Sequence, residues 1–150
     1  MANNTLIGIA GVHYVVSELS RRGLVALPTI RNTAAYDIVA LNEQGTKHAN
    51  IQVKASSKRV TFFPMPPAEK VRTGRHDIYV FVRWLPQEER YECFLLTGRQ
   101  ARSAVEEEIE SQRVSMKTGK RRVEWPCVAV GPKKAKAAEK WRLAWLKWNL

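Results

Sequence analysis

The chain has 150 residues, 45% hydrophobic and 26% charged, and its 25 Lys and Arg against 14 Asp and Glu give a net charge of +11. This length fits one domain with its own core. So basic a composition favours a polyanionic partner, by default nucleic acid, and argues against acidic-protein mimicry. No apolar run approaches the roughly 18 residues of a membrane span. The mildly apolar start contains His13 and no preceding Lys or Arg, so we expect no signal peptide, a cytoplasmic location and no membrane partner.

Periodicity and turn residues predict alternating helices and strands. Apolar residues at helical spacing over 7–22 predict a first helix, which ends at Gly23. Pro64, Pro66 and Pro67 break up a long connection over 58–74. In chain order, the other expected elements are strands at 24–27, 36–41 and 51–57, an edge strand at 60–63, strands at 77–84 and 91–96, a helix at 99–113, a basic loop at 115–122, a short strand or irregular segment at 123–130, and a helix at 132–150.

The C-terminal helix is expected to be amphipathic. Trp141, Trp145 and Trp148 share one face with Ala138, and lysines form a neighbouring stripe. The tryptophan face would pack either on the domain formed by residues 1–131 or at a homodimer interface, with 132–150 as the added helix. The lysines would face water, contact phosphates, or do both.

The sequence singles out one polar patch. Alternation places Gln52, Lys54 and Ser56 on one face of the strand over 51–57. A hairpin centred between Gln44 and Gly45 puts Asp37 opposite Gln52 and diagonal to Lys54. An ordinary interpretation is a cross-strand ion pair between Asp37 and Lys54. The alternative is a site.

The segments GIAGVHYVVSELSRRG, Tyr36-Asp37 and IQVK over 51–54 resemble the PD-(D/E)XK nuclease superfamily. The resemblance is strongest to Holliday-junction resolvases and to small bacterial nuclease-like proteins with an IQVK strand. It implies a restriction-endonuclease-like α/β fold, in which helices flank a mixed central sheet. It also implies a DNA phosphodiesterase that uses Mg²⁺ or Mn²⁺.

Site residues follow from the resemblance. Asp37, Gln52 and Lys54 would be catalytic, and Asp37, Gln52 and the Val53 carbonyl would hold the metal. Two positions depart from the family: Gln52 replaces an acidic residue, and Val12 stands where resolvase-like members carry a glutamate on the first helix. These departures leave open a degenerate protein that binds DNA or a partner protein without cleaving. The expected nucleic-acid-binding residues are Arg31, Asn32, Ser56, Lys58, Lys133, Lys136 and Lys140.

Overall fold

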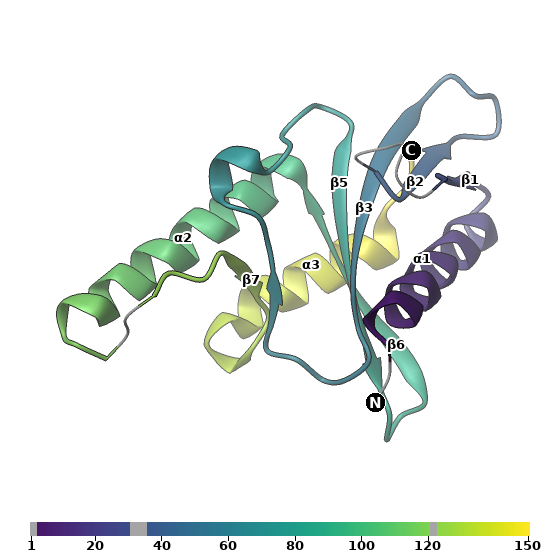
Figure 1. Cartoon of the computed structure of the whole chain (residues 1–150). Coiled ribbons are helices and arrows are strands. Elements are labelled where there is room, and N and C mark those ends of the chain that lie inside the picture. Colours follow the sequence, from purple (N-terminus) through teal and green to yellow (C-terminus); the bar gives the residue numbers. More distant parts are fainter. Residues whose placement is uncertain (1–2, 31–35, 121–122) are drawn as a thin grey trace.

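A computed structural model describes residues 3–30, 36–120 and 123–150, which form a mixed α/β structure with helices flanking a mixed central sheet (Figure 1). This is the fold class that the sequence predicts. The elements are α1 (Asn4–Arg21), β1 (Val25–Pro28), β2 (Ile38–Leu41), β3 (His48–Ser56), β4 (Phe62–Pro64), η1 (Ala68–Lys70), β5 (Asp77–Leu85), β6 (Arg90–Thr97), α2 (Gly98–Lys117), β7 (Cys127–Ala129), η2 (Pro132–Lys134) and α3 (Ala135–Lys147).

The central sheet has the strand order β1-β2-β3-β5-β6. Strands β1, β2 and β3 pair antiparallel, β3 pairs parallel with β5, and β5 pairs antiparallel with β6. Ile38 lies opposite Ile51 and Leu41 opposite His48, so the hairpin register predicted from the sequence is confirmed. That register sets which side chains share a face with Asp37.

Each face of the sheet has its own apolar cluster. On one face Ile51 and Val53 pack with Val15 and Leu19 of α1. On the other face Phe81 and Phe94 pack with Val105 of α2. Lys54 lies opposite Phe81 and so belongs to this second face, whereas Asp37 lies just before β2 and borders a cavity lined by α1.

Local signals explain the limits of α1. The Asn3 side chain accepts a hydrogen bond from the Thr5 N–H at 2.9 Å, which caps the first turn. After the helix, Gly23 has φ +80, a conformation that glycine adopts at little cost. The helix begins three residues before the predicted start, because the cap lies upstream of the apolar stripe.

The largest differences from the predicted elements concern the expected basic loop and the proline-rich connection. Helix α2 continues to Lys117 and takes up the start of the expected basic loop. The proline-rich connection contributes β4, which pairs antiparallel with β7 in a separate two-stranded ribbon instead of lying at the edge of the main sheet. The prediction failed here because the pairing joins segments far apart in the chain.

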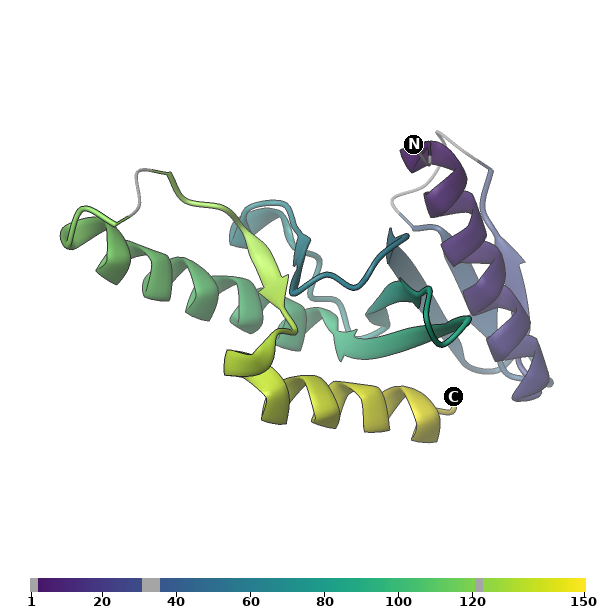
Figure 2. The same cartoon turned by 90° about the horizontal axis from the view of Figure 1, so that it is seen from below.

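Helix α3 packs against β6, and its C-terminal end lies near the C-terminal end of α1, where the Arg22 guanidinium is 5.0 Å from the centre of the Trp145 ring (Figure 2). Trp145 is 3% exposed within the core cluster around α1, whereas Ala138 belongs to the cluster around α2. The chain itself therefore covers Trp145. Proline opens a short 3-10 turn before the helix, so α3 begins at Ala135 and not at Pro132. Across the three described ranges, no helix is both long and apolar enough to cross a membrane.

Candidate functional site

Asp37 lies at the start of β2 and is hydrogen-bonded to the next strand. Its Oδ2 accepts hydrogen bonds from Gln52 Nε2 at 2.6 Å and from the Val53 backbone N–H at 2.7 Å. Its own backbone N–H donates to the Ile51 carbonyl, and its carbonyl accepts from the Thr29 N–H. Backbone bonds on both sides thus fix the position of the carboxylate.

The local strand geometry explains why a carboxylate is needed here. Strand β2 begins at Ile38, so its regular pairing with β3 stops beside Val53. The Val53 N–H would lack a backbone partner, and a buried N–H without a partner costs about 1–3 kcal/mol. Asp37 supplies the acceptor. Part of its role is therefore structural, whatever else the site does.

Lys54 lies two residues after Gln52 on β3 and does not pair with Asp37. No ion pair or hydrogen bond links the Lys54 ammonium to any other residue in the described ranges, and its side chain is half-buried. The expected cross-strand ion pair is therefore wrong, because the amide of Gln52 lies directly opposite Asp37 and takes the carboxylate. Lys54 keeps its charge available for a negatively charged ligand.

A cavity of about 300 Å³ adjoins Asp37. Val12 and His13 of α1 line it together with Asp37 and Val53. The first helix thus brings position 12 to the site, as the resemblance implies, but with an apolar side chain. Glu18 forms ion pairs with Arg21 and Arg22 at 3.3 and 2.8 Å and does not line this cavity.

The residues that would hold Mg²⁺ or Mn²⁺ do not form a suitable donor set. Such ions prefer several oxygen ligands with negative charge. Gln52 presents an amide N–H to Asp37, not an oxygen, and Oδ2 of Asp37 already accepts two hydrogen bonds. In the part of the chain that the structure describes, no three His, Cys, Asp or Glu residues come together as a metal site. These two bonds satisfy Oδ2 of Asp37 without a cation.

Arg72 is a residue near the site that sequence reasoning did not place. Its guanidinium lies 4.6 Å from the centre of the Tyr36 ring, next to Asp37. Its backbone N–H donates to the Tyr79 hydroxyl at 3.1 Å, and Tyr79 is the neighbour of Gln52 across β3 and β5. Arg72 therefore contacts Tyr36, which precedes Asp37, and Tyr79, which lies opposite Gln52. In the sequence, only the basic side chain of Arg72 suggested a role. The position of the 58–74 connection in the fold could not be predicted.

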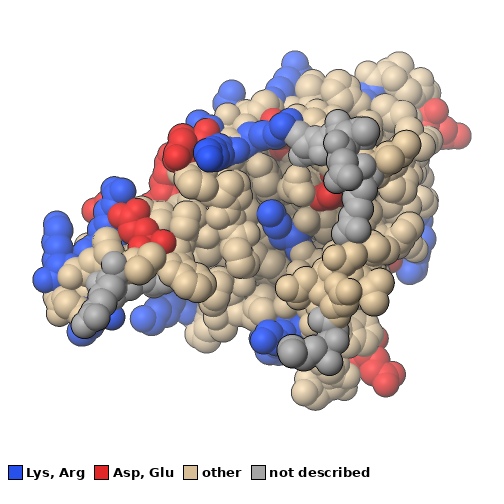
Figure 3. Space-filling model, viewed as in Figure 1, with Lys and Arg blue, Asp and Glu red and all other residues tan. Residues whose placement is uncertain are grey.

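The other predicted nucleic-acid-binding residues fall into three groups. Ser56 and Lys58 follow Lys54 at the end of β3, where Ser56 Oγ donates to the Lys58 carbonyl. Three lysines lie on the exposed side of η2 and α3, apart from the Asp37 cavity: Lys133, Lys136 and Lys140. Arg31 and Asn32 lie outside the described residues. Figure 3 shows a hollow in the face that it draws, with both basic and acidic side chains around it.

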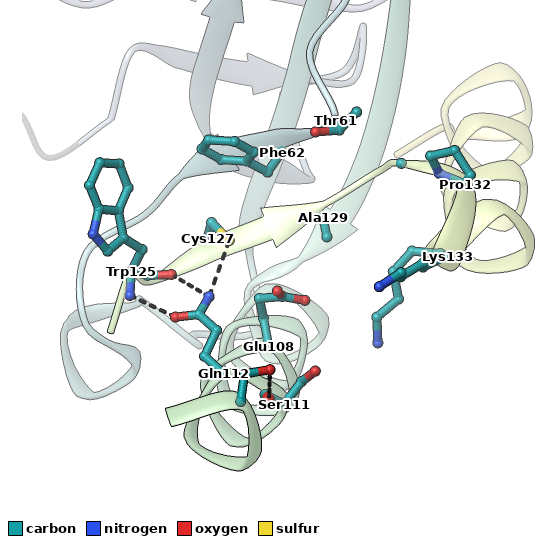
Figure 4. A pocket seen from close by; sticks show the side chains of 13 residues that line it. Thr61, Phe62, Glu108, Ser111, Gln112, Trp125, Cys127, Ala129, Pro132 and Lys133 are labelled. Carbon is teal, nitrogen blue, oxygen red and sulfur yellow. Dashed lines mark hydrogen bonds between the residues drawn. The ribbon is translucent and has the colours of Figure 1, made fainter. Parts of the chain in front are cut away.

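A larger cavity, of about 570 Å³, lies between α2 and the β4–β7 ribbon (Figure 4). Gln112 is 3% exposed there, and its amide bonds both backbone groups of Trp125: Trp125 N–H donates to Oε1 at 2.7 Å, and Nε2 donates to the Trp125 carbonyl at 2.9 Å. Nothing in the sequence pattern singled out this cavity, because its two walls come from distant segments.

No protein-family model and no curated protein matches the chain. Among solved structures, a bacterial homing endonuclease, I-Ssp6803I, is similar at 16% identity and a TM-score of 0.47, over 66% of this chain and 68% of that one. A likeness at this level says nothing about activity, so function has to be argued from the residues of the site.

Proposed function

We propose that this protein is a nuclease-like, nucleic-acid-binding domain that holds a phosphodiester backbone beside Lys54 without cleaving it. The observation that carries the proposal is the state of Asp37. Gln52 and Val53 both donate to its Oδ2, while Lys54, two residues after Gln52, has no ion-pair or hydrogen-bond partner among the described residues. A site that retains its lysine and not its metal ligands can attract a phosphate but lacks the positive charge that metal-dependent hydrolysis needs.

The order of the elements supports the nuclease-like part of the proposal. A helix is followed by a strand with Asp37, a hairpin, and a strand with Gln52 and Lys54, which is the arrangement that the sequence resemblance implies. Val12 lines the cavity of Asp37, where the resemblance places a glutamate. The restriction-endonuclease-like topology remains part of the proposal, together with the roles of these residues.

Charge supports nucleic acid as the partner, and the sequence resemblance is what points to DNA. A net charge of +11 favours a polyanion, and Figure 3 shows basic side chains around the hollow on one face of the molecule. Arg72, held over Tyr36, adds a second cation close to Asp37. Lys54 and Arg72 are therefore the two cations that we assign to the phosphate.

The test is binding of labelled duplex, branched and single-stranded DNA at several salt concentrations. Each phosphate contact should contribute a slope of about −0.9 to log K against log salt. Lys54→Ala should weaken binding and flatten the slope by about one contact, whereas Lys47→Ala, an exposed lysine in the β2–β3 turn, should change neither. Affinity that is independent of salt, or equal in both variants, would contradict the proposal.

A second candidate is a phosphodiesterase that depends on Mg²⁺ or Mn²⁺. It is favoured by the hydrogen bond between Gln52 and Asp37, which brings together two of the three residues that the sequence resemblance assigns to catalysis. Purified protein would then nick DNA when either ion is added, and Asp37→Ala and Lys54→Ala would abolish nicking. If nicking survives both substitutions, the activity comes from a contaminant or from another site.

The variant Val12→Glu combined with Gln52→Glu separates the two candidates. If the scaffold is intact and only ligands were lost, the double variant should gain metal-dependent cleavage that the parent lacks. If the parent already cleaves, the second candidate is correct. A homodimer also remains a proposal, to be tested by sedimentation; because Trp145 is buried within the chain, such an interface would have to use other exposed residues such as Leu143 and Leu146.

A further inference from the structure

The cavity between α2 and the β4–β7 ribbon has two exposed aromatic side chains in its lining. Phe62 is 41% exposed and Trp125 is 55% exposed, although large aromatic residues are usually well buried. Pairing within the ribbon explains the position of Phe62, because its neighbour Phe63 turns into the core beside Phe81. Figure 4 shows both rings at the side of the cavity away from Pro132 and Lys133.

Gln112 fixes the backbone that carries the Trp125 ring. Its amide exchanges two hydrogen bonds with Trp125, in the way a neighbouring strand would. Gln112 is therefore committed to the structure and is not available to a ligand. The aromatic wall is held in place before anything binds, which lowers the entropy cost of binding.

The remaining polar groups divide the cavity into an acidic and a basic part. Glu108 lines it from α2 and has no ion pair among the described residues, whereas its neighbour Glu107 pairs with Lys134. Lys133 lines the opposite end, and it too lacks an ion-pair partner in the described part of the chain. Lys136 is exposed one turn further along.

We infer that this cavity binds an unpaired nucleotide, with the base stacked on Phe62 and Trp125, an amino group of the base donating to Glu108, and the phosphate on Lys133. Stacking on aromatic rings suits any base, and a carboxylate accepts a hydrogen bond from an exocyclic amino group. A volume of about 570 Å³ is within the range of small-molecule sites. The inference uses the nucleic-acid partner of the proposed function but none of its residues.

Glu108 gives the site a preference among bases. Cytosine and adenine carry an exocyclic amino group, whereas thymine has the carbonyl oxygen O4 at the position of the cytosine amino group, and a carboxylate would repel that oxygen. Single-stranded oligonucleotides of dC or dA should therefore bind more tightly than those of dT. A cavity that recognised only aromatic stacking would bind all three alike.

The test is titration of the whole protein with dC and dT oligonucleotides about 12 nucleotides long, followed by tryptophan fluorescence. Binding should quench the emission, and Trp125→Phe should lose part of that quenching. Trp125→Ala and Phe62→Ala should each weaken binding roughly 5- to 100-fold. Val114→Ala, a 55% exposed residue on α2 that does not line the cavity, is the matched control and should bind like the parent.

Substitution of Glu108 tests the base preference. Glu108→Gln should remove the preference for dC over dT, whereas Glu106→Gln, which makes the same charge change outside the cavity, should preserve it. Lys133→Gln should weaken dC and dT binding equally. Circular dichroism and thermal melting would establish that each variant is folded.

The outcomes distinguish this inference from the proposed function. Lys54→Ala should leave the Trp125-dependent quenching intact, and that quenching would support the cavity even if duplex DNA fails to bind. If Trp125→Ala, Phe62→Ala and Glu108→Gln bind both oligonucleotides as the parent does, or if no oligonucleotide changes the emission of Trp125, the inference is overturned, whatever else the cavity accepts.

Discussion

Gly11 of α1 lies directly against Ala55 of β3: a Cβ atom built on Gly11 would be 2.5 Å from the Cβ of Ala55. No real pair of Cβ atoms approaches so closely. The absence of a side chain at Gly11 therefore sets the distance between α1 and the sheet. Because Val12 follows it, the same contact sets how deeply the first helix enters the cavity beside Asp37.

Gly11→Ala and Gly8→Ala should have opposite effects on stability. The added methyl group at Gly11 forces the helix away from β3, at a cost of about 1–3 kcal/mol. At Gly8 nothing lies within 4 Å, so the better helix propensity of alanine should stabilise the protein by up to about 1 kcal/mol. Urea denaturation of both variants measures the difference. Equal effects would mean that the contact with Ala55 does not limit the packing.

Gln52→Glu should destabilise the protein in the absence of divalent ions. The substitution removes the 2.6 Å hydrogen bond to Asp37 and places two carboxylates opposite each other, at a cost of about 1–3 kcal/mol. Added Mg²⁺ should restore part of the loss if the two carboxylates can share the ion. Thermal unfolding with and without Mg²⁺ measures this, with Gln44→Glu in the exposed turn as the control for charge. A variant as stable as its parent would show that the Asp37–Gln52 bond contributes little.

Gln112→Ala should cost about 1–3 kcal/mol, because both backbone groups of Trp125 lose their partner. Ser111→Ala, an exposed neighbour on the same helix, should change stability by less than about 0.5 kcal/mol. Without Gln112 to hold its backbone, Trp125 should also be quenched more strongly by acrylamide. Unchanged stability in Gln112→Ala would mean that water replaces the amide at no cost.

Alkaline pH should destabilise the protein partly through Tyr14. Burial raises the pKa of its hydroxyl from 10.0 to about 12, and the neighbouring Cys93 and Glu18 add to the shift. Only the unfolded chain then loses the proton between these values, so the free energy of unfolding is unaffected by Tyr14 below pH 10 and falls as the pH rises toward 12.

Tyr14→Phe should make this fall less steep, as measured by urea denaturation at several pH values between 10 and 12. Some slope should remain, because burial also raises the pKa of the Cys93 thiol. If parent and variant lose stability in parallel over that range, Tyr14 is not the group that titrates. Phenylalanine keeps the ring that lies 4.5 Å from the Tyr91 ring between centroids, so the substitution removes the hydroxyl without removing this ring contact.

Local patterns in the sequence predict much of the framework around the candidate site. The apolar stripe and Gly23 define the end of α1, and the turn around Gln44 and Gly45 sets the register that pairs Ile38 with Ile51, next to Asp37 and Gln52. These features depend on neighbours within a few residues, so periodicity and turn chemistry are enough to identify them. Burial of Cys93, at 3% exposure, follows in the same way from its place in a strand.

Contacts between distant segments were decided only by the tertiary structure. Pairing of β4 with β7, the position of Arg72 over Tyr36, and the cavity walled by Phe62 and Trp125 all join parts of the chain that no local pattern relates. The partner of Asp37 was also decided by the tertiary structure. The sequence allowed either Gln52 or Lys54 as that partner. Because regular pairing ends at Ile38, the Asp37 carboxylate accepts a hydrogen bond from the Val53 N–H and another from the Gln52 amide, and Lys54 stays unpaired among the described residues.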